Sequence, residues 1–548
     1  MNISRREWLQ ALVVSLVLVA IVTLPYILGH TLARPGTFFT GLVMNPEDSQ
    51  SYFAKMLQGY DGQWLYRIPF TPEAHRPAFV GGFYLALGQL ARFLGLSLIQ
   101  IWHLARALAS LFLFLITFGF IARFLDQARW RWTAFILAIV GSGLGWLFLV
   151  LNQAQWLGAF LVDFRMPESH LFFTALTYPH VAAGTGLLLV VFWLLLEALT
   201  ANRRAWLYAL AAGLANLVLG IVYPFLVFLV GTTAGLYWIY LSIQKRRLLW
   251  RQAGLAAIAF AVPLPLFLYY AYTYRVNDVY RAWAEQAATL SPPWPHYLIA
   301  YGLLLAPAVL PLLRKSWREQ IDDSLAFLWL WLLAAAFLLY GPLGQQRRFV
   351  QGLQVPLSVL ATVGLKSVIL PWLLATRPFQ RLASRPRYST DGLTSLLLFA
   401  FVAFTAISSL YLWADVTAMT TFVQPYPFFR TQEEAAAVDW LRANADPHEV
   451  VLTTYETGNF VAARSGLPVV IGHWAETINW GRRLADTDAF YDASAGDDWR
   501  QDYLNAHDVR YVWHGPLERA IGDYDPGRSP YLRPFYDGSE TQIYSVQP

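Results

Sequence analysis

The sequence predicts an α-helical polytopic membrane protein with about 11 transmembrane helices, its N-terminus inside, its C-terminus outside, and a small C-terminal α/β domain on the outer side. The first observation is composition: the 548 residues are 57% apolar and only 14% charged, whereas an average soluble domain is about 25% charged. The second is that several uncharged runs are long enough to cross a bilayer. The third is that short segments with alternating strand-like and helix-like patterns replace these runs from about residue 430.

The composition also excludes several classes of site and partner. The chain has no cysteine, which excludes disulfides, thiolate metal sites and a cysteine nucleophile. Its net charge of +5 is small for this length, and no basic stripe is interleaved with aromatic residues, so we expect no nucleic-acid partner. We assign the positive charge to loops beside the membrane helices.

The first membrane helix begins close to the N-terminus. Arg5 and Arg6 precede an uncharged run from Leu9 to Gly29. This run is longer than the core of a signal peptide and no convincing cleavage site follows it, so we expect the helix to be retained. The same criterion along the chain gives eleven windows: 9–30, 98–122, 132–151, 179–198, 205–222, 223–243, 252–274, 297–313, 324–342, 354–376 and 392–414.

The orientation follows from the basic residues, which gather in alternate loops between these windows. Loops rich in Lys and Arg stay in the cytoplasm, and eleven spans satisfy this rule with the N-terminus inside and the C-terminus outside. A further apolar run, Ala78 to Ala91, has only 14 residues before Arg92. Counting it as a span would place the later basic loops outside, so we interpret it as an interfacial or re-entrant helix; the alternative is a short tilted span. The basic sets are Arg5 and Arg6; Arg123, Arg129 and Arg131; Arg203 and Arg204; Lys245, Arg246 and Arg247; Arg314, Lys315 and Arg318; and Arg377, Arg381, Arg385 and Arg387.

This topology divides the chain into a transmembrane domain, 1–415, and an extracytoplasmic α/β domain, 416–548. The transmembrane domain has a first outer loop at 31–97 and a second at 152–178. The acidic and histidine-bearing motifs concentrate in these outer segments. We therefore expect the chemistry to face away from the cytoplasm, at the plasma membrane.

The C-terminal segment reads as alternating helices and strands. TQEEAAAVDWLRANA (431–445) has a capping residue, early glutamates and an apolar stripe, so it predicts a helix. Strands and helices then alternate, which predicts a small, mostly parallel sheet. GHWAETINWGRR (472–483) is either a substrate loop or a segment that packs this domain onto the membrane part. The strands are EVVLTTY, LPVVIGH, VRYVWHG, YLRPFYDG and TQIYSVQ, the helices NFVAARSG and DDWRQDYLNAH, and Asp537-Gly538 is a turn.

The stretch NPEDSQSY (45–52) places two adjacent carboxylates, Glu47 and Asp48, in the first outer loop. If a helix begins here, Asp48, Tyr52 and Lys55 share one face. A carboxylate just outside a membrane helix suits the removal of a proton from an acceptor hydroxyl, or the binding of a metal or a polar acceptor. Proline and acids in a first turn are equally typical of an ordinary helix N-terminus. The residues alone leave both interpretations open.

One N-terminal span followed by an acidic pair and a tyrosine (NPEDSQSYFAKM) resembles the first-loop motif of the GT-C superfamily of membrane glycosyltransferases, as in protein O-mannosyltransferases and lipid A aminoarabinose transferases. Those enzymes carry an Asp-Glu pair, whereas the order here is Glu-Asp, which puts in doubt which acid is the base. The segment GYDGQWLYRIPFTPEAHRP (59–77) resembles the end of that loop, with His75, Arg76 and Pro77 at the matching positions.

The resemblance extends along the whole chain. DFRMPESH supplies Asp163 and Glu168 at the place of a second acidic site on the outer face, and His180 follows in TYPHVAAG. GQQRRFVQGLQVP supplies Arg347 and Arg348, where many members have an arginine-bearing segment at the outer end of a late helix. A soluble C-terminal domain outside the membrane is also common in the superfamily.

The resemblance implies an enzyme that moves a hexosyl or pentosyl group from a polyprenyl-phosphate donor to an acceptor hydroxyl or similar nucleophile, with inversion. The acceptor is a lipid, a polysaccharide or a protein. The second acidic site would either bind a divalent cation, Mg²⁺ or Mn²⁺, or position the acceptor. The implied site residues are Asp48 and Glu47 as catalytic acids with Tyr52 beside them; Arg347, Arg348, Arg76 and His75 on the donor phosphate; and Asp163, Glu168 and His180 on the acceptor or the cation.

Two other functions compete with this one. A transporter or flippase for lipid-linked saccharides should show internal repeats and polar groups near the middle of the membrane. The sequence has no convincing repeat, and its charged residues gather at the outer edge. A non-catalytic GT-C-like assembly subunit is the other alternative, and in it Glu47 and Asp48 would be dispensable.

Overall fold

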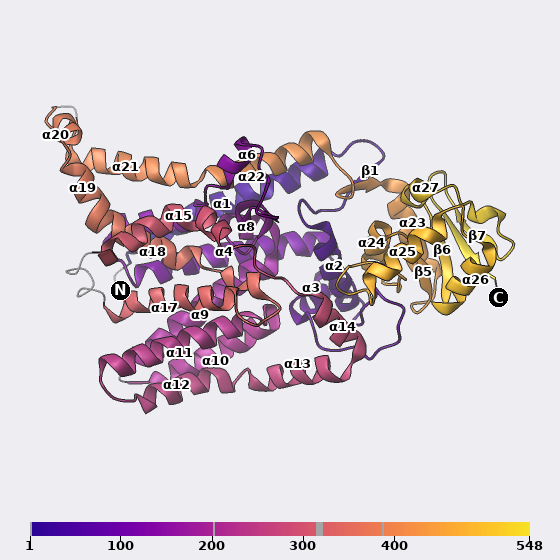
Figure 1. The fold of residues 1–548 in the computed structure, drawn as a ribbon, viewed down its shortest axis with the longest axis horizontal. Coiled ribbons are helices and arrows are strands. Elements are labelled where there is room, and N and C mark those ends of the chain that lie inside the picture. Colours follow the sequence, from indigo (N-terminus) through magenta and orange to yellow (C-terminus); the bar gives the residue numbers. More distant parts are fainter. Residues whose placement is uncertain (1–2, 201–202, 314–321, 386–387, 548) are drawn as a thin grey trace. The chain divides into compact units, whose positions relative to one another are not determined.

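The computed structural model describes residues 3–200, 203–313, 322–385 and 388–547, which are mostly helical (Figure 1). The chain forms two compact units. The first contains Met1–Leu24, Ala105–Phe267 and Thr289–Val416, and the second contains Pro25–Leu104, Leu268–Ala288 and Thr417–Pro548. The second unit therefore combines the first predicted outer loop with the C-terminal segment. The predicted domain boundary after residue 415 stays a prediction.

Long apolar helices dominate the fold. Among the described residues, seven helices are long and apolar enough to cross a membrane, and two bent helix pairs raise this number to as many as nine. These helices agree with a multi-pass membrane protein, whereas the eleven spans and their orientation stay predictions. The seven are α1 (Arg5–Thr31), α4 (Leu98–Ala122), α9 (Pro179–Thr200), α10 (Ala205–Val222), α11 (Leu226–Gln244), α15 with η1 (Pro295–Leu313), and α18 with η3 and α19 (Gln354–Leu374).

The other four predicted windows are helical too, but their helices are interrupted or short. A proline at position 263 separates α12 from α13, because it lacks an N–H and cannot continue the hydrogen-bonding pattern of the helix. The sequence GSGL, 141–144, separates α5 from α6. The bounds are α5 (Ala128–Val140), α6 (Gly145–Val150), α12 (Trp250–Ala261), α13 (Leu264–Val276), α17 (Asp323–Leu339), α20 (Arg377–Ala383), α21 (Thr390–Thr405) and α22 (Ile407–Ala418) with η4 (Met419–Val423). The predicted cytoplasmic residues Arg314, Lys315, Arg318 and Arg387 lie outside the described residues.

Side chains compensate for a proline inside α1. Pro25 cannot donate a backbone hydrogen bond to the carbonyl of Ile21. The indole Nε1 of Trp413 donates to that carbonyl instead, at 2.8 Å. The buried guanidinium of Arg106 donates to the next carbonyl, that of Val22, at 3.4 Å. Polar backbone groups in an apolar surrounding need such partners, so the helix continues through the proline.

The first unit places three short helices beside the long ones. The short helix α7 (Val162–Arg165) lies against α15, α8 (Leu171–Thr177) lies against α9 and α5, and η2 (Gln346–Val350) lies against α17. The long helices α9, α10 and α12 pack together, and α15 packs on α18 (Figure 1). Asp163 lies on α7, Glu168 in the turn between α7 and α8, and the predicted arginine segment on η2.

The second unit contains a four-stranded sheet in the order β5-β6-β8-β7. Only β5 and β6 are parallel, and both β6–β8 and β7–β8 are antiparallel. The prediction of a mostly parallel sheet was therefore wrong: the turn at Gly538 joins β7 directly to β8, and strands joined by a tight turn must be antiparallel. The segment LPVVIGH, predicted as a strand, contributes only an isolated bridge between Val469 and Val451.

Among the described residues, five helices accompany this sheet: α23, α24 and α26 correspond to predicted helices, whereas α25 and α27 were not predicted. The helix α24 ends at Ser465, where Gly466 adopts the left-handed conformation of a helix C-cap (φ 81°). Figure 1 shows α23 to α27 and the strands within this unit. The bounds are β5 (Val450–Leu452), β6 (Val509–His514), β7 (Leu532–Asp537), β8 (Gln542–Val546), α23 (Gln432–Asn444), α24 (Tyr455–Ser465), α25 (Trp480–Tyr491), α26 (Asp497–Ala506) and α27 (Pro516–Ile521).

The first-loop part of this unit is built around α2 (Pro46–Tyr60), which packs against both α3 (Gly82–Leu94) and α24. Glycines permit the close approach of α2 and α3: a methyl group on Gly59 would overlap the carbonyl of Leu85, and one on Gly88 would overlap the carbonyl of Met56. Strand β1 (Thr37–Phe39) pairs antiparallel with β4 (Phe429–Thr431). The first loop and the C-terminal segment therefore fold as one body. The helical form of Ala78–Ala91 is confirmed by α3, and its place at the membrane surface stays a prediction.

Candidate functional site

The acidic pair lies in the first turn of α2. The helix begins at Pro46, and Asn45 before it has a left-handed backbone (φ 42°). Glu47 and Asp48 therefore stand where the helix dipole stabilises negative charge. This position agrees both with a functional acidic pair and with an ordinary helix N-terminus. The surroundings of the two side chains must distinguish these interpretations.

The two acids have different surroundings. The Nε2 atom of His473 lies 3.2 Å from Oδ1 of Asp48. The His473 side chain is 7% exposed, whereas that of Asp48 is 30% exposed. Glu47 is exposed, and its negative charge adds to burial in raising the pKa of Tyr455. Asp48 thus combines access to solvent with a fixed imidazole neighbour.

Behind Asp48, the same helix carries a buried ion pair. Lys55 Nζ lies 3.0 Å from Oε1 of Glu476, and both side chains are almost completely buried. Glu476 also accepts hydrogen bonds from the hydroxyls of Ser51 and Tyr66. Burial alone raises the pKa of Glu476, but Lys55, His473 and these hydrogen bonds lower it by more, so its pKa lies below its ordinary value. The carboxylate is therefore charged at neutral pH and fully paired.

His473 and Glu476 belong to one loop, residues 472–477, that the first-loop segment and α14 (Asp278–Gln286) hold in place. The side-chain amide of Gln286 donates to the carbonyls of Ala475 and Thr477, at 3.2 and 2.8 Å. The Thr477 hydroxyl donates to the carbonyl of Phe70 at 2.7 Å. The sequence pointed to this stretch as a substrate loop or a packing segment. It did not identify His473 or Glu476 as partners of α2, because they lie more than 400 positions away in the sequence.

Tyr52 lies one turn after Asp48 on α2, in an aromatic stack. Its ring centroid is 4.5 Å from that of Tyr84, which in turn is 5.5 Å from Trp102. The rings are nearly parallel, with interplanar angles of 15° in both pairs. Stacking fixes the phenol ring and therefore the direction in which its hydroxyl points.

His75 and Arg76, both predicted to bind the donor phosphate, differ in whether their side-chain nitrogens are already hydrogen-bonded within the protein. Both ring nitrogens of His75 are occupied by backbone groups: Nε2 is 2.9 Å from the amide of Ile68, and Nδ1 is 2.8 Å from the carbonyl of Glu73. His75 therefore braces its own loop. The Arg76 side chain is exposed, and within the described residues the structure records no ion pair for it.

The predicted second acidic site is in the first unit, where Glu168 is buried against Arg348. The Arg348 guanidinium forms an ion pair with the Glu168 carboxylate, and the Tyr223 hydroxyl donates to the same carboxylate at 3.2 Å. Burial raises the pKa of Glu168, and Arg348 and Arg347 lower it by more, so the net pKa is lowered. The His180 ring stacks on Tyr223, with centroids 5.4 Å apart. The structure therefore brings Glu168, His180 and Arg348 together.

Asp163 belongs to a different group of the first unit. Its Oδ1 accepts a hydrogen bond from the amide of Gly143 at 2.6 Å and lies 3.4 Å from Nε2 of His170. The other ring nitrogen of His170 lies 3.2 Å from the side-chain oxygen of Gln354. His170, which the sequence analysis did not single out, is thus the neighbour of Asp163.

Arg347 differs from Arg348 in having no ion pair with a carboxylate among the described residues. Its backbone amide donates to the carbonyl of Thr289 at 3.1 Å, which fixes the position of η2. The side chain is half-buried, and its Nε is buried without a hydrogen-bond partner in the described part of the chain. An arginine with an unsatisfied, partly buried guanidinium is suited to an anionic ligand.

The predicted cation ligands do not assemble. Asp163 faces Gly143 and His170, Glu168 faces Arg348 and Tyr223, and His180 stacks on Tyr223. In the described ranges, no three His, Asp or Glu side chains are placed to hold a metal ion. We therefore derive no step through a cation, and a divalent cation stays a prediction.

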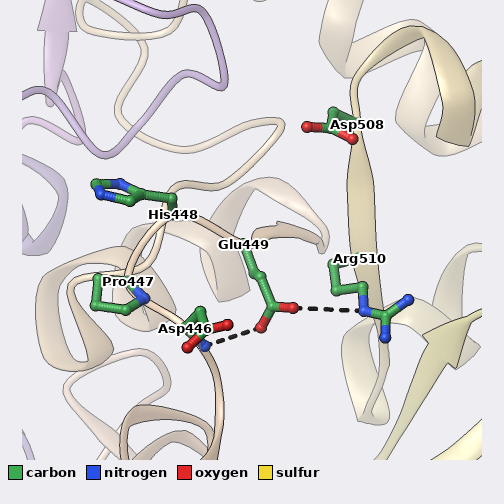
Figure 2. Close-up of a pocket in the computed structure, with 6 residues that line it drawn as sticks. All are labelled: Asp446, Pro447, His448, Glu449, Asp508 and Arg510. Carbon is green, nitrogen blue, oxygen red and sulfur yellow. Dashed lines mark hydrogen bonds and ion pairs between the residues drawn. The ribbon is translucent and has the colours of Figure 1, made fainter.

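A hollow in the surface of the second unit lies at the start of β6 (Figure 2). Glu449 dominates it, because one of its oxygens accepts from the Asp446 amide at 2.9 Å and the other lies 3.4 Å from Arg510. Glu449 and Arg510 form an ion pair with each other, and no predicted site residue lines the hollow. The lining residues are Asp446, Pro447, His448, Glu449, Asp508 and Arg510.

No family model and no curated protein matches the chain, but solved structures share its fold. The oligosaccharyltransferase AglB of Archaeoglobus fulgidus, tethered to an acceptor peptide, aligns with a TM-score of 0.54 at 15% identity, over 100% of this chain and 74% of that one. ArnT of Cupriavidus metallidurans, bound to undecaprenyl phosphate, gives 0.53 at 12% identity, over 99% and 98%. The arabinofuranosyltransferase AftD from Mycobacteria gives 0.52 at 15% identity, over 100% and 40%.

These three neighbours are GT-C glycosyltransferases, so the chain has the GT-C fold and the resemblance seen in its first-loop motif is confirmed at the level of the fold. Two further structures of AglB add ligands: one contains an inhibitory peptide and a dolichol-phosphate, and the other contains Zn and sulfate. Polyprenyl phosphates are thus ligands of two of these neighbours.

Proposed function

We propose that this protein is a glycosyltransferase of the plasma membrane that moves a sugar from a polyprenyl-phosphate donor to an acceptor hydroxyl or similar nucleophile on the outer face. The observation that carries the proposal is the placement of Asp48, a partly exposed carboxylate held beside an imidazole in the first turn of α2, in a chain with the GT-C fold. The neighbours AglB and ArnT, which bind dolichol-phosphate and undecaprenyl phosphate, support a donor of this chemical class.

In the proposed reaction, the acceptor oxygen attacks the anomeric carbon of the sugar and its proton passes to the Asp48 carboxylate. The bond between the anomeric carbon and the phosphate oxygen breaks, and polyprenyl phosphate leaves with the bonding electrons. Configuration at the anomeric carbon inverts. We assign the proton to Asp48 rather than Glu47, because Asp48 is the acid that lies beside the buried His473 imidazole while remaining partly exposed. Glu47 then adds negative charge beside the base.

The leaving phosphate needs positive charge, and we assign this role first to Arg347. Its guanidinium has no carboxylate partner within the described residues, whereas Arg348 is already paired with Glu168. Arg348 then fixes Glu168, and the Glu168–Tyr223–His180 group is a candidate for acceptor positioning. Arg76, exposed in the first loop, is a further candidate for the phosphate. His75 is a weaker one, because both its nitrogens are occupied.

The proposal includes the predicted topology of eleven spans with the C-terminus outside. The acceptor is a lipid, a polysaccharide or a protein, and AglB, tethered to an acceptor peptide, is a neighbour that uses the last of these.

The test compares polyprenyl-linked sugars, measured by mass spectrometry, in a strain that lacks the protein and in the same strain carrying wild type, Asp48→Asn or Glu47→Gln. We expect one lipid-linked sugar to accumulate without the protein and to disappear with wild type. Asp48→Asn should clear it about 10²- to 10⁴-fold more slowly, the usual contribution of a general base, and Glu47→Gln less so. Asp502→Asn, an exposed acid on α26, is the matched control and should behave as wild type.

The opposite outcome separates the alternatives. If both acid variants clear the lipid as wild type does, neither acid takes part in the mechanism. A transporter or an assembly subunit is then favoured, and uptake of the accumulated lipid-linked sugar into protein-containing vesicles distinguishes these two.

A further inference from the structure

We infer that His473, from the 472–477 loop, is a positioning residue for the base Asp48, so that the C-terminal segment completes the acid site. This inference rests on the proposed function for its catalytic meaning. Its structural content is separate: the loop fixes the direction of the Asp48 carboxylate through a hydrogen bond from His473.

The geometry fixes which ring nitrogen carries the proton. Nε2 of His473 lies 3.2 Å from Oδ1 of Asp48, and a carboxylate can only accept a hydrogen bond. Nδ1 is buried and has no partner among the described residues. A neutral ring with its proton on Nδ1 would leave that proton unsatisfied and would turn a lone pair toward the carboxylate. The proton therefore belongs on Nε2, which donates to Asp48.

The loop is attached to the same face of α2 that carries Asp48. Asp48, Ser51 and Lys55 are spaced by three and four positions, the spacing of one helix face. His473 meets the first of them, and Glu476, three residues later, meets the other two. The loop thus contacts this face at two points, and the second is a buried ion pair whose partners are fully enclosed.

Further contacts prevent the loop from pivoting about these two points. The Tyr66 hydroxyl donates to the second oxygen of Glu476 at 2.7 Å. Gln286 holds the backbone on both sides of Glu476 through the carbonyls of Ala475 and Thr477. The imidazole therefore has a fixed position relative to α2, which is the requirement for orienting a carboxylate.

A base that must meet an acceptor proton depends on orientation, because a displacement of about 1 Å can cost up to about 100-fold in rate. Loss of the His473 hydrogen bond should leave donor binding intact and slow the transfer itself. His473 does not contact the reacting atoms in this scheme, so it acts through Asp48.

The experiment uses the full-length protein in detergent and the variants His473→Ala, His473→Gln and the control His448→Ala, an exposed histidine of the same unit. The readout is labelling of Asp48 and Glu47 by a water-soluble carbodiimide with an amine nucleophile, quantified by peptide mass spectrometry. We expect His473→Ala to raise the labelling rate of Asp48 severalfold and to leave Glu47 unchanged. His473→Gln places an amide N–H near the position of Nε2 and should restore much of the wild-type rate.

The second readout is transfer. With the lipid-linked sugar extracted from the deletion strain as donor, we expect His473→Ala to lower kcat about 10- to 100-fold with little change in KM for the donor, and His448→Ala to match wild type. Unchanged Asp48 labelling in a folded His473→Ala protein, verified by its size-exclusion profile and melting curve, would overturn the inference. If Asp48 labelling changes in His473→Ala but the wild-type protein transfers no sugar, His473 positions Asp48 as inferred and the proposed function is wrong.

Discussion

Each unit of this molecule buries a carboxylate against a cation, but the two pairs are built differently. In the second unit, Glu476 and Lys55 enclose each other almost completely, and two hydroxyls satisfy the rest of the carboxylate. In the first unit, Glu168 is equally buried, but its partner Arg348 remains 18% exposed, and the neighbouring Arg347 forms no ion pair in the described part of the chain. The Glu476–Lys55 pair is therefore fully enclosed, whereas the region of the Glu168–Arg348 pair also contains the positive charge of Arg347.

This difference separates charges that fix structure from charges that are available to a ligand. A closed pair holds two segments together and offers nothing to a substrate. An arginine without a carboxylate partner retains donors for an anion. The first two experiments below test this difference, and the other two test how firmly the buried carboxylates and the 472–477 loop are held.

The largest effect is expected from opening the closed pair. Glu476→Ala leaves the Lys55 ammonium buried without its partner, which costs about 3–5 kcal/mol of stability. The double variant Lys55→Met with Glu476→Leu removes both charges and should recover most of that loss. Thermal melting of the purified protein measures both. Arg528→Ala, which breaks an exposed pair with Asp525, is the control and should have an effect of about 0–1 kcal/mol. Equal losses in the single and double variants would show that the pair itself is unimportant.

The next effect concerns the available arginine. Arg347→Gln should weaken the binding of undecaprenyl phosphate about 10- to 100-fold, because a hydrogen bond to a charged group contributes about 1.5–3 kcal/mol. Native mass spectrometry with a lipid titration measures this affinity. Arg348→Gln should act differently: it removes the ion-pair partner of the buried Glu168 carboxylate and should therefore lower the melting temperature. If Arg347→Gln binds the lipid as tightly as Arg528→Gln, an exposed control, the assignment of Arg347 to phosphate is wrong.

A smaller effect is expected from the brace of the 472–477 loop. Gln286→Ala removes two hydrogen bonds to backbone carbonyls, each contributing about 0.5–1.5 kcal/mol. Hydrogen–deuterium exchange of peptides covering 472–477 should accelerate, whereas Gln501→Ala, an exposed glutamine on α26, should change nothing there. Unchanged exchange in the Gln286 variant would mean that the buried pair alone holds the loop.

The smallest effect is expected from mild acidification, and it has the same sign in both units. The pKa values of Glu476 and Glu168 lie below the ordinary value of 4.5. The stability that these charges contribute is therefore fully present above that value and is lost as the pH falls through the lower, folded pKa. Hydrogen exchange around residues 168 and 476, compared at about pH 6 and about pH 4, should show the onset of loosening. Glu476→Gln and Glu168→Gln should remove the pH dependence at their own positions only, and a dependence that survives them must come from other groups.

Much of this fold follows from local patterns. Each of the eleven apolar windows is helical, α23 begins after its predicted capping residue, and α24 ends at its predicted glycine but begins four residues earlier than predicted. The sheet direction was wrong because the alternation of strands and helices predicts parallel neighbours, whereas the chain closes with the β7–β8 hairpin. The turn signal at Asp537-Gly538 identified that hairpin, but the alternation rule outweighed it.

The site was less accessible to sequence reasoning. The motif identified Glu47 and Asp48, and the charged, aromatic composition of 472–483 marked that stretch as notable. Their meeting depends on contacts between positions more than 400 residues apart, such as Ser51 with Glu476, and no local pattern encodes such a contact. His170 beside Asp163 was missed for a different reason: a histidine in an apolar run gives no local sign of its partner.

The glycine contact between α2 and α3 has a consequence for natural and laboratory variation. Gly59 and Gly88 have no room for even one added carbon, because backbone oxygens occupy the space on the facing helix. Helix α2, which carries the acids, therefore contacts α3 backbone to backbone at both glycines, and a larger residue at either position would push the two helices apart. In a library of random single substitutions, positions 59 and 88 should be among the least forgiving of the second unit, although neither has a side chain to lose.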